Sequence, residues 1–168
     1  MAIAEFKVGD VLMYGSVGLV EIIDCRRERA LGDNREYYIL KEIGSPSDSK
    51  IFVPKDSERL VGNMRRLISA DKARELLSGK ELVAVEWTKD NRARSERFRK
   101  IIESGDRVLL LSLISAINKA RLERIKEGKK GFILDENTIE KAIRLITAEF
   151  SYVLSTPPEK IRQILSNI

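Results

Sequence analysis

The sequence contains no histidine and a single cysteine, Cys25. Without histidine, Ser-His and Cys-His nucleophilic systems and histidine-containing metal sites are excluded. One cysteine forms neither an internal disulfide nor a cysteine-rich zinc cluster, and we interpret Cys25 as a small apolar strand residue in a reducing cytoplasm. The glycine motifs that cradle phosphates are absent as well. The sequence therefore predicts a protein that is not an enzyme and that uses no metal or cofactor.

Long apolar runs and aromatic residues are also scarce. The longest uninterrupted aliphatic run is Val108–Leu111, and aromatic residues make up only 6% of the chain. No such run spans a membrane, and the first ten residues lack the pattern of a secretory signal. With 43% hydrophobic and 34% charged residues, the 168-residue chain fits one ordinary domain or two small ones. We expect a cytoplasmic protein with no membrane partner and no small-molecule substrate.

The charge is distributed unevenly along the chain. Residues 1–62 carry 9 Lys and Arg against 11 Asp and Glu, whereas residues 63–168 carry 22 against 15. The excess is concentrated in two basic clusters: Lys89, Arg92, Arg94, Arg97, Arg99 and Lys100, then Lys119, Arg121, Arg124, Lys126, Lys129 and Lys130. This asymmetry predicts either that the second half meets a polyanion or that these bases form a solvated helix face.

Residues 1–62 have the pattern of short strands separated by turns. The segments Val11–Tyr14, Leu19–Cys25, Arg35–Ile43 and Lys50–Pro54 are rich in β-branched, aromatic and aliphatic residues. Gly32–Asn34 is typical of a hairpin turn, and Pro54 suits an edge strand. Four or five short strands in this length predict a small, strongly bent sheet, which is a Tudor/SH3-like β-barrel.

Residues 63–168 have the periodicity of helices. We expect helices at Ala70–Leu77, at Asn91–Glu103 and from a cap at Asp106 to about Glu127, then one capped by Asp135 and one capped by Thr156 with Pro157 as its first residue. The predicted fold class is therefore α+β, with a β-barrel in residues 1–62 followed by an all-α domain in residues 63–168. No tight helix–turn–helix pattern nominates a helix that reads a DNA groove.

Several motifs occur in order along nearly the whole chain. The opening Phe6–Asp10 and the later Glu36–Leu40, Val53–Pro54 and Leu60–Gly62 resemble the first domain of the CarD/CdnL family of transcription regulators, which also occurs as the RNA polymerase-interacting domain of transcription-repair coupling factors. In the second half, Trp87 with its basic stretch, Glu103–Asp106 and Thr147–Phe150 match the family's later motifs.

This resemblance implies a bridge between RNA polymerase and promoter DNA. In the family, the Tudor-like domain binds the polymerase β subunit by extending a sheet, and the helical domain places a tryptophan against the minor groove at the upstream edge of the melted region. Carried onto this chain, the polymerase-binding positions are Arg26, Phe52 and Pro54. The wedge that stabilises the open complex is Trp87. The DNA-binding bases are Lys89, Arg92, Arg94 and Arg97.

The residues themselves leave some of these roles open. Trp87, the only tryptophan, follows Leu82, Val83 and Val85 but sits beside polar residues, which fits either a core residue or a functional one. Phe52 fits either core packing or a contact. The second basic cluster either extends the DNA-facing surface or complements the end of a long helix.

Two other functions remain as alternatives to the transcription regulator. One is an SH3/KOW-like RNA-binding module that acts with ribosomes or elongating polymerase. The other is a nuclease that uses carboxylates to hold a metal ion, although the acidic residues are scattered among bases as in ordinary surface charge.

Overall fold

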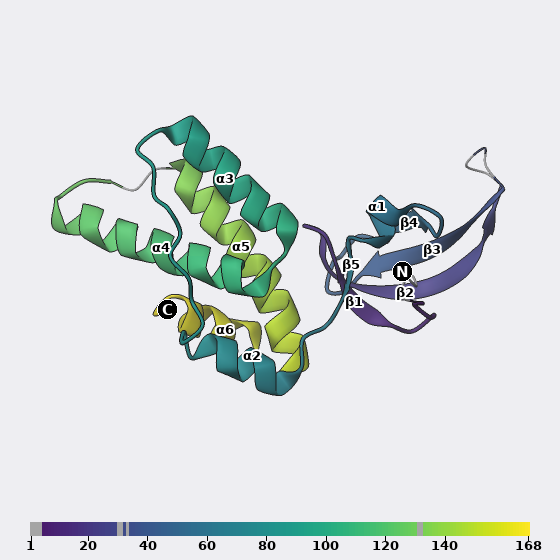
Figure 1. Cartoon of the computed structure of the whole chain (residues 1–168). Coiled ribbons are helices and arrows are strands. Elements are labelled where there is room, and N and C mark those ends of the chain that lie inside the picture. Colours follow the sequence, from purple (N-terminus) through teal and green to yellow (C-terminus); the bar gives the residue numbers. More distant parts are fainter. Residues whose placement is uncertain (1–4, 30–31, 33, 131–132) are drawn as a thin grey trace. The chain divides into compact units, whose positions relative to one another are not determined.

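The computed structural model describes residues 5–29, 32, 34–130 and 133–168, with the backbone alone at 133–135. The chain divides into two compact units, residues 1–67 (unit 1) and residues 68–168 (unit 2). The elements follow one another as β1 (Val11–Tyr14), β2 (Gly18–Glu28), β3 (Arg35–Glu42), β4 (Lys50–Pro54), α1 (Glu58–Val61), β5 (Met64–Arg66), α2 (Ala70–Leu77), α3 (Asn91–Ser104), α4 (Arg107–Lys126), α5 (Ile133–Val153) and α6 (Pro158–Leu165) (Figure 1). The chain is therefore α+β, as the sequence predicted.

Unit 1 is built on a five-stranded antiparallel sheet with the order β4-β3-β2-β1-β5. The β2–β3 pairing runs from Val20 opposite Glu42 to Glu28 opposite Arg35, and its register shifts between Ile22 and Asp24. Such a bulge bends a strand and increases its twist. Of the predicted Gly32–Asn34 turn between these strands, Asp33 lies outside the described residues.

The sheet of unit 1 is open. Its two edges are β4 and β5, and among the described strands β4 pairs with β3 while β5 pairs with β1. The sequence predicted a closed barrel because short, bent strands suit one. Strand patterns identify strands, but closure depends on which edges meet, and the two edge strands here are short, with five and three residues.

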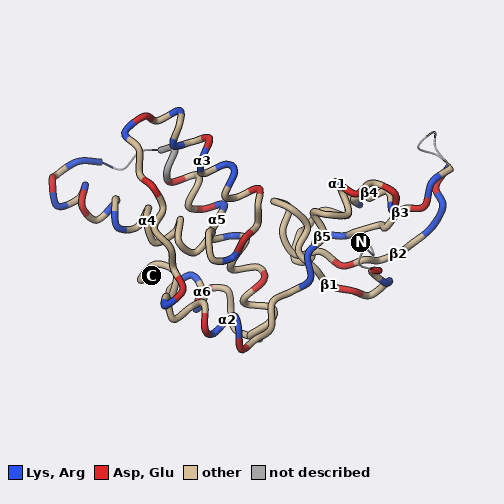
Figure 2. Tube along the Cα trace, in the orientation of Figure 1, with Lys and Arg blue, Asp and Glu red and all other residues tan. Residues whose placement is uncertain are grey.

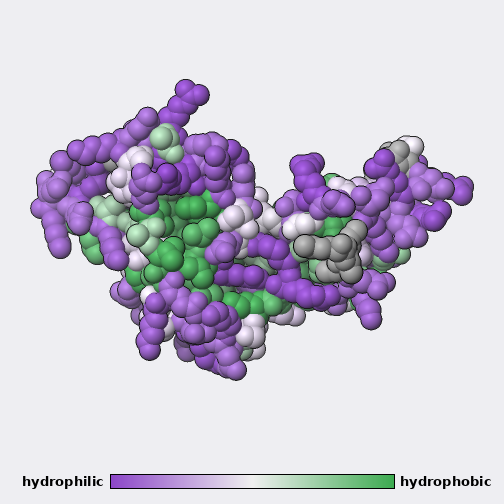
Figure 3. Space-filling model, in the orientation of Figure 1, coloured by the Kyte–Doolittle hydropathy of each residue, from purple (hydrophilic) through white to green (hydrophobic). Residues whose placement is uncertain are grey.

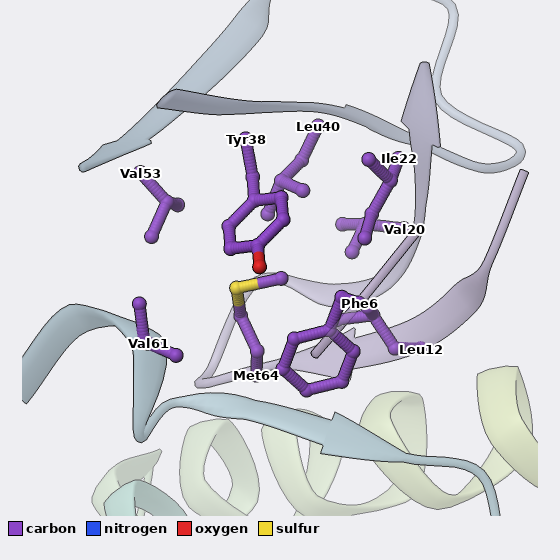
Figure 4. Close-up of a cluster of buried hydrophobic side chains, with 9 residues drawn as sticks. All are labelled: Phe6, Leu12, Val20, Ile22, Tyr38, Leu40, Val53, Val61 and Met64. Atoms are coloured by element: carbon purple, nitrogen blue, oxygen red, sulfur yellow. The ribbon is translucent and has the colours of Figure 1, made fainter. Parts of the chain in front are cut away.

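One face of the sheet carries the core of unit 1. Alternate residues of the strands point to it, together with Phe6 and the side chains that α1 and β5 supply. The cluster consists of Phe6, Leu12, Val20, Ile22, Tyr38, Leu40, Val53, Val61 and Met64 (Figure 4). The Phe6 and Tyr38 rings meet edge to face with centroids 6.0 Å apart. Because every member lies between residues 6 and 64, unit 1 has a core of its own.

Unit 2 consists of the five helices α2–α6. Helix α4 supplies the buried residues Leu111, Leu113 and Ile114, and α5 supplies Ile146 and Phe150. On the face that Figure 3 shows, hydrophobic residues gather in the middle of this unit with hydrophilic residues around them. In the described part of the chain, no helix is long and apolar enough to cross a membrane.

Two adjacent capping residues, Gly105 and Asp106, determine where α3 ends and α4 begins. Helix α3 ends at Gly105, whose φ of 61° is the left-handed conformation that glycine adopts without strain. The Asp106 carboxylate accepts the N–H of Leu109 at 2.9 Å and caps α4, as predicted. The cap predicted at Asp135 is wrong, because α5 begins two residues earlier, at Ile133.

A buried ion pair ties the start of unit 2 to its helices. Glu149 on α5 is 2% exposed, and its carboxylate accepts the N–H of Ile68 at 2.9 Å. The same carboxylate accepts two N–H groups from Arg107 on α4, at 3.0 and 2.6 Å. The segment at Ile68 and the start of α4 thus both bind one carboxylate on α5. This carboxylate holds the first residues of unit 2 against α5.

Candidate functional sites

Trp87 lies in the extended segment between α2 and α3, which runs across α4. The N–H of Val83 donates to the Ser112 hydroxyl at 3.0 Å and holds this segment on α4. The Trp87 indole packs against Phe98 of α3, with ring centroids 5.7 Å apart and planes 56° apart. Phe98 is 1% exposed, whereas Trp87 is 37% exposed. The tryptophan is therefore anchored on the core through part of its surface and open to solvent through the rest.

Arg94 lies beneath this indole rather than on the surface. Its guanidinium carbon is 4.9 Å from the Trp87 ring centroid, and the residue is only 2% exposed. The guanidinium donates to the Thr88 carbonyl at 2.8 Å and to Asn91 Oδ1 at 2.9 Å. Of the four predicted DNA-binding bases, this one is buried.

The other three predicted bases lie at the surface near Trp87. Lys89 and Arg92 are exposed. Arg97 is exposed too, but it forms an ion pair with Glu86, the residue before Trp87. The structure thus brings all five predicted residues into one region of unit 2 and leaves Lys89 and Arg92 as the exposed bases at the start of α3.

Acidic residues offset part of the basic charge on α3. Arg99 bonds to Glu96 at 2.6 Å and to Glu103 at 2.5 Å. These two carboxylates raise the pKa of Arg99 above its ordinary value, and Arg99 in turn lowers the pKa of Glu96. Figure 2 shows Lys and Arg along α3 and at the end of α4 with Asp and Glu among them. The positive charge in the middle of α3 is therefore partly neutralised, and the remaining basic surface lies at the start of α3 and the end of α4.

A groove of about 390 Å³ adjoins Trp87 on the side of α4. Four apolar and four charged residues line it: Val85, Trp87, Ala116 and Ala120, and Lys119, Glu123, Arg124 and Glu127. Arg124 also donates to the carbonyl of Lys130. Two members of the second basic cluster, Lys119 and Arg124, therefore lie next to the tryptophan. Sequence reasoning left open whether the second cluster extends the surface around Trp87, because their proximity depends on the packing of the segment before α3 on α4.

In unit 1, the three predicted polymerase-binding residues share one face of the sheet. Arg26 on β2 is opposite Tyr37 on β3, and Tyr37 is opposite Pro54 on β4. Directly paired residues point to the same face, and Phe52 is two residues from Pro54 along the strand. This face is opposite the one that carries the core. The sequence identified three of its members but missed Tyr37, which lies between them.

Arg26, Phe52 and Pro54 are at least partly exposed on this face, whereas Tyr37 between them is buried, and the side chains interact with one another. Phe52 meets Tyr37 edge to face, with centroids 6.2 Å apart. Arg26 forms ion pairs with Asp24 at 3.1 Å and with Glu28 at 3.2 Å, and its side chain is 51% exposed. Arg26 and the half-buried Phe52 and Pro54 thus form a surface that is apolar at the edge of the sheet and charged on β2.

The edge strand β4 also offers backbone groups. In an antiparallel ladder, residues alternate between those that bond the neighbouring strand and those that point away from it. The bond from Lys55 N–H to the Glu36 carbonyl, 2.9 Å, continues the β3–β4 register and places Val53 in the bonded set. The N–H and C=O of Phe52 therefore point away from β3. Pro54 belongs to the same outward set, where its missing N–H costs no bond to β3.

Comparison with known proteins gives a match to the first part of the chain. Residues 6–68 match the family model of the CarD-like/TRCF RID domain. No curated protein matches the sequence. The matched segment covers the whole sheet of unit 1, including Arg26, Phe52 and Pro54. Within the described residues, no group of three or more Cys, Asp or Glu side chains is placed to hold a metal ion.

Proposed function

We propose that this protein is a non-catalytic regulator of transcription initiation, because residues 6–68 match the family model of the CarD-like/TRCF RID domain, whose members interact with RNA polymerase. Unit 1 binds the polymerase β subunit as a Tudor-like module, and unit 2 contacts promoter DNA in the cytoplasm. The family match carries the first half of this proposal. The partly exposed Trp87 among bases carries the second half.

The polymerase contact is made by β4 and the face next to it. A strand of the partner adds to the edge of the sheet through the outward N–H and C=O of Phe52, and main-chain bonds of this kind provide affinity without strict sequence requirements. The side chains of Arg26, Phe52 and Pro54 then provide specificity. Arginine suits this place because its planar guanidinium pairs with a partner carboxylate.

The DNA contact is made by Trp87 as a wedge at the upstream edge of the open bubble. Inserting an apolar ring at a base step costs a few kcal/mol of unstacking, which phosphate contacts and a partly melted step offset. Lys89 and Arg92 supply the phosphate contacts. Arg97 supplies a further one by exchanging its ion pair with Glu86 for a phosphate. Because phosphate contacts carry no base information, DNA binding is dependent on salt and largely indifferent to sequence.

Neither contact has to be strong by itself. When unit 1 is bound to polymerase, unit 2 meets the promoter at a high effective concentration, so two weak contacts act together. The proposal therefore requires both activities in one chain.

The experiment that tests this function is the lifetime of the promoter open complex with Trp87→Ala protein. We expect a shorter lifetime than with the unchanged protein, because the wedge is lost while polymerase binding stays. Tyr152→Ala is the matched control, since Tyr152 is a 47% exposed aromatic residue on helix α5 of the same unit. An unchanged lifetime with folded, polymerase-bound Trp87→Ala protein would remove the wedge. Recovery of ribosomal RNA instead of the β subunit in a pull-down would favour an RNA-binding module.

A further inference from the structure

Arg94 has the geometry of a support for Trp87 rather than of a phosphate ligand. A base that binds DNA phosphates has to reach solvent, yet Arg94 is 2% exposed while Arg92, two residues earlier on α3, is exposed. Its guanidinium carbon lies 4.9 Å from the centroid of the indole, within the range of a cation–π contact.

The contacts of Arg94 fix the indole through two routes. Arg94 and Phe98 are four residues apart on α3, so they form one surface of the helix, and both contact the Trp87 ring. Arg94 also donates to the carbonyl of Thr88 at 2.8 Å, which holds the backbone next to the tryptophan. One side chain thus holds both the ring of Trp87 and the carbonyl of the next residue, Thr88.

The start of α3 in turn fixes Arg94. Its second bond reaches Asn91 Oδ1 at 2.9 Å. The Asp90 carboxylate caps the helix by accepting the N–H groups of Arg92 and Ala93, at 2.8 and 3.2 Å. The Thr88 hydroxyl donates to the Asp90 carbonyl at 3.2 Å. Hydrogen bonds therefore fix the turn from Thr88 to Asn91. The Arg94 guanidinium, which is bonded to both ends of this turn, is fixed with it.

From this geometry we infer that Arg94 is a positioning residue, which holds the Trp87 indole in one orientation before DNA is met and makes no phosphate contact itself. This inference deepens the proposed function and rests on it for its consequence. A side chain that is ordered in the free protein loses less conformational entropy on binding, so the orientation raises the stability of the wedged complex. A planar, delocalised cation is needed, because a lysine ammonium has no flat face to stack on the ring, and its freely rotating donors do not hold the carbonyl and amide oxygens in the rigid fork of a guanidinium.

The first test needs neither polymerase nor DNA, because Trp87 is the only tryptophan and its fluorescence reports on this site alone. We compare Arg94→Lys with Arg92→Lys, a matched change on the same helix at an exposed position. We expect Arg94→Lys to increase acrylamide quenching and lower the anisotropy of the indole, and Arg92→Lys to leave both unchanged. Far-UV circular dichroism verifies that each variant is folded.

The second test measures open-complex lifetime against salt concentration. We expect Arg94→Lys to shorten the lifetime about three- to tenfold at every salt concentration, with an unchanged salt slope. Arg92→Ala should instead reduce the slope by about one unit, as the loss of one phosphate contact does. Should Arg94→Lys fail to fold, Asn91→Ala removes one guanidinium partner and is expected to change fluorescence and lifetime in the same directions to a smaller extent.

Three results would overturn the inference. Unchanged quenching and anisotropy in Arg94→Lys would show that the indole is held without Arg94. A reduced salt slope in Arg94→Ala, equal to that of Arg92→Ala, would make Arg94 a phosphate contact. A mobile indole with an unchanged lifetime would remove the role of orientation. If Trp87→Ala itself leaves the lifetime unchanged, the wedge fails, and the fluorescence comparison still decides whether Arg94 positions the ring.

Discussion

At the scale of single residues, Arg26 and Arg27 provide a matched pair for testing the face of the sheet that we propose binds the polymerase. They are consecutive on β2, so their side chains point to opposite faces. Arg26 shares its face with Tyr37 and Pro54, whereas Arg27 is opposite Glu36. We expect Arg26→Ala to weaken binding to the polymerase β subunit about tenfold, as loss of an interface arginine does, and Arg27→Ala to leave it nearly unchanged. Titration calorimetry with the β subunit measures both.

Neither substitution is expected to change the stability of the fold enough to affect this comparison of binding affinities. The ion pairs of both arginines lie at the surface, where removal of such a pair changes the free energy of unfolding by about 0–1 kcal/mol. Equal losses of affinity in the two variants would contradict the assignment of the partner to the Arg26 face.

A second prediction at this scale concerns the buried Glu149. Glu149→Leu removes the acceptor for Ile68 N–H and leaves the Arg107 guanidinium without its buried carboxylate. Breaking a buried pair from one side costs about 3–5 kcal/mol, and the 23% exposure of the Arg107 side chain places the expected loss near the lower end. Glu140→Leu is the control, because its pair with Arg162, 2.9 Å, is exposed and contributes at most about 1 kcal/mol. Urea unfolding measures the free energy of unfolding of both variants. Similar losses of stability in the two would contradict a stabilising role of the Glu149 carboxylate.

Residue roles could be predicted from the sequence only where they depend on residue type. The indole at position 87 stood out because it is the only one in the chain. Arg94 and Arg92 could not be separated by sequence, because both are bases in one cluster and only the packing of the segment before α3 buries one of them. Tyr37 was missed as a neighbour of Arg26 because strand register is not visible in a single strand.

At the scale of elements, local signals predicted helix ends where one residue type decides them. Gly105 and Asp106 combine a left-handed stop with a cap, so the boundary between α3 and α4 followed directly. The start of α6 was less determined. Thr156 was the expected cap, with Pro157 first in the helix, whereas Pro157 occupies the cap position and Pro158 begins the helix. Two consecutive prolines both suit a first turn, so the sequence does not choose between them.

The edge strand β4 supports the third prediction. The Phe52 N–H points away from β3, so Phe52→Pro removes an outward donor without breaking a β3–β4 bond, and Pro54 shows that the strand accepts proline in this set. We expect Phe52→Pro to weaken β-subunit binding more than Phe52→Ala, which removes the ring but keeps the N–H. The difference between the two measures the main-chain bond, about 0.5–1.5 kcal/mol or roughly two- to tenfold in affinity.

Both variants have to remain folded for this comparison, which thermal unfolding establishes. Val53→Pro serves as the destructive control, because Val53 is fully buried and lies in the bonded set. Equal affinities of the Pro and Ala variants at position 52 would mean that the partner does not add a strand through this N–H.

At the scale of the whole molecule, the change from strands to helices was visible in the sequence, but its position differs from the expected one. The sequence placed the division after residue 62, where strand-like alternation stops. In the structure the division falls between Leu67 and Ile68, because Met64–Arg66 pair with β1 as β5. A three-residue strand has too few alternations to be recognised, so its place depends on a partner distant in sequence.

The separate core of unit 1 leads to the last prediction. All nine residues of its buried cluster lie between Phe6 and Met64, so residues 1–67 contain the sheet, its core and the Arg26 face. Domains of about this size often fold alone.

The two contacts reinforce each other only when they are linked in one chain. Residues 1–67 should therefore bind the β subunit without placing Trp87 at the promoter. We expect the fragment, added to complexes formed with the whole protein, to shorten open-complex lifetime toward the value without the protein. The same fragment carrying Arg26→Ala should compete about tenfold less well. A fragment that binds the β subunit yet leaves the lifetime unchanged would show that stabilisation does not depend on unit 1.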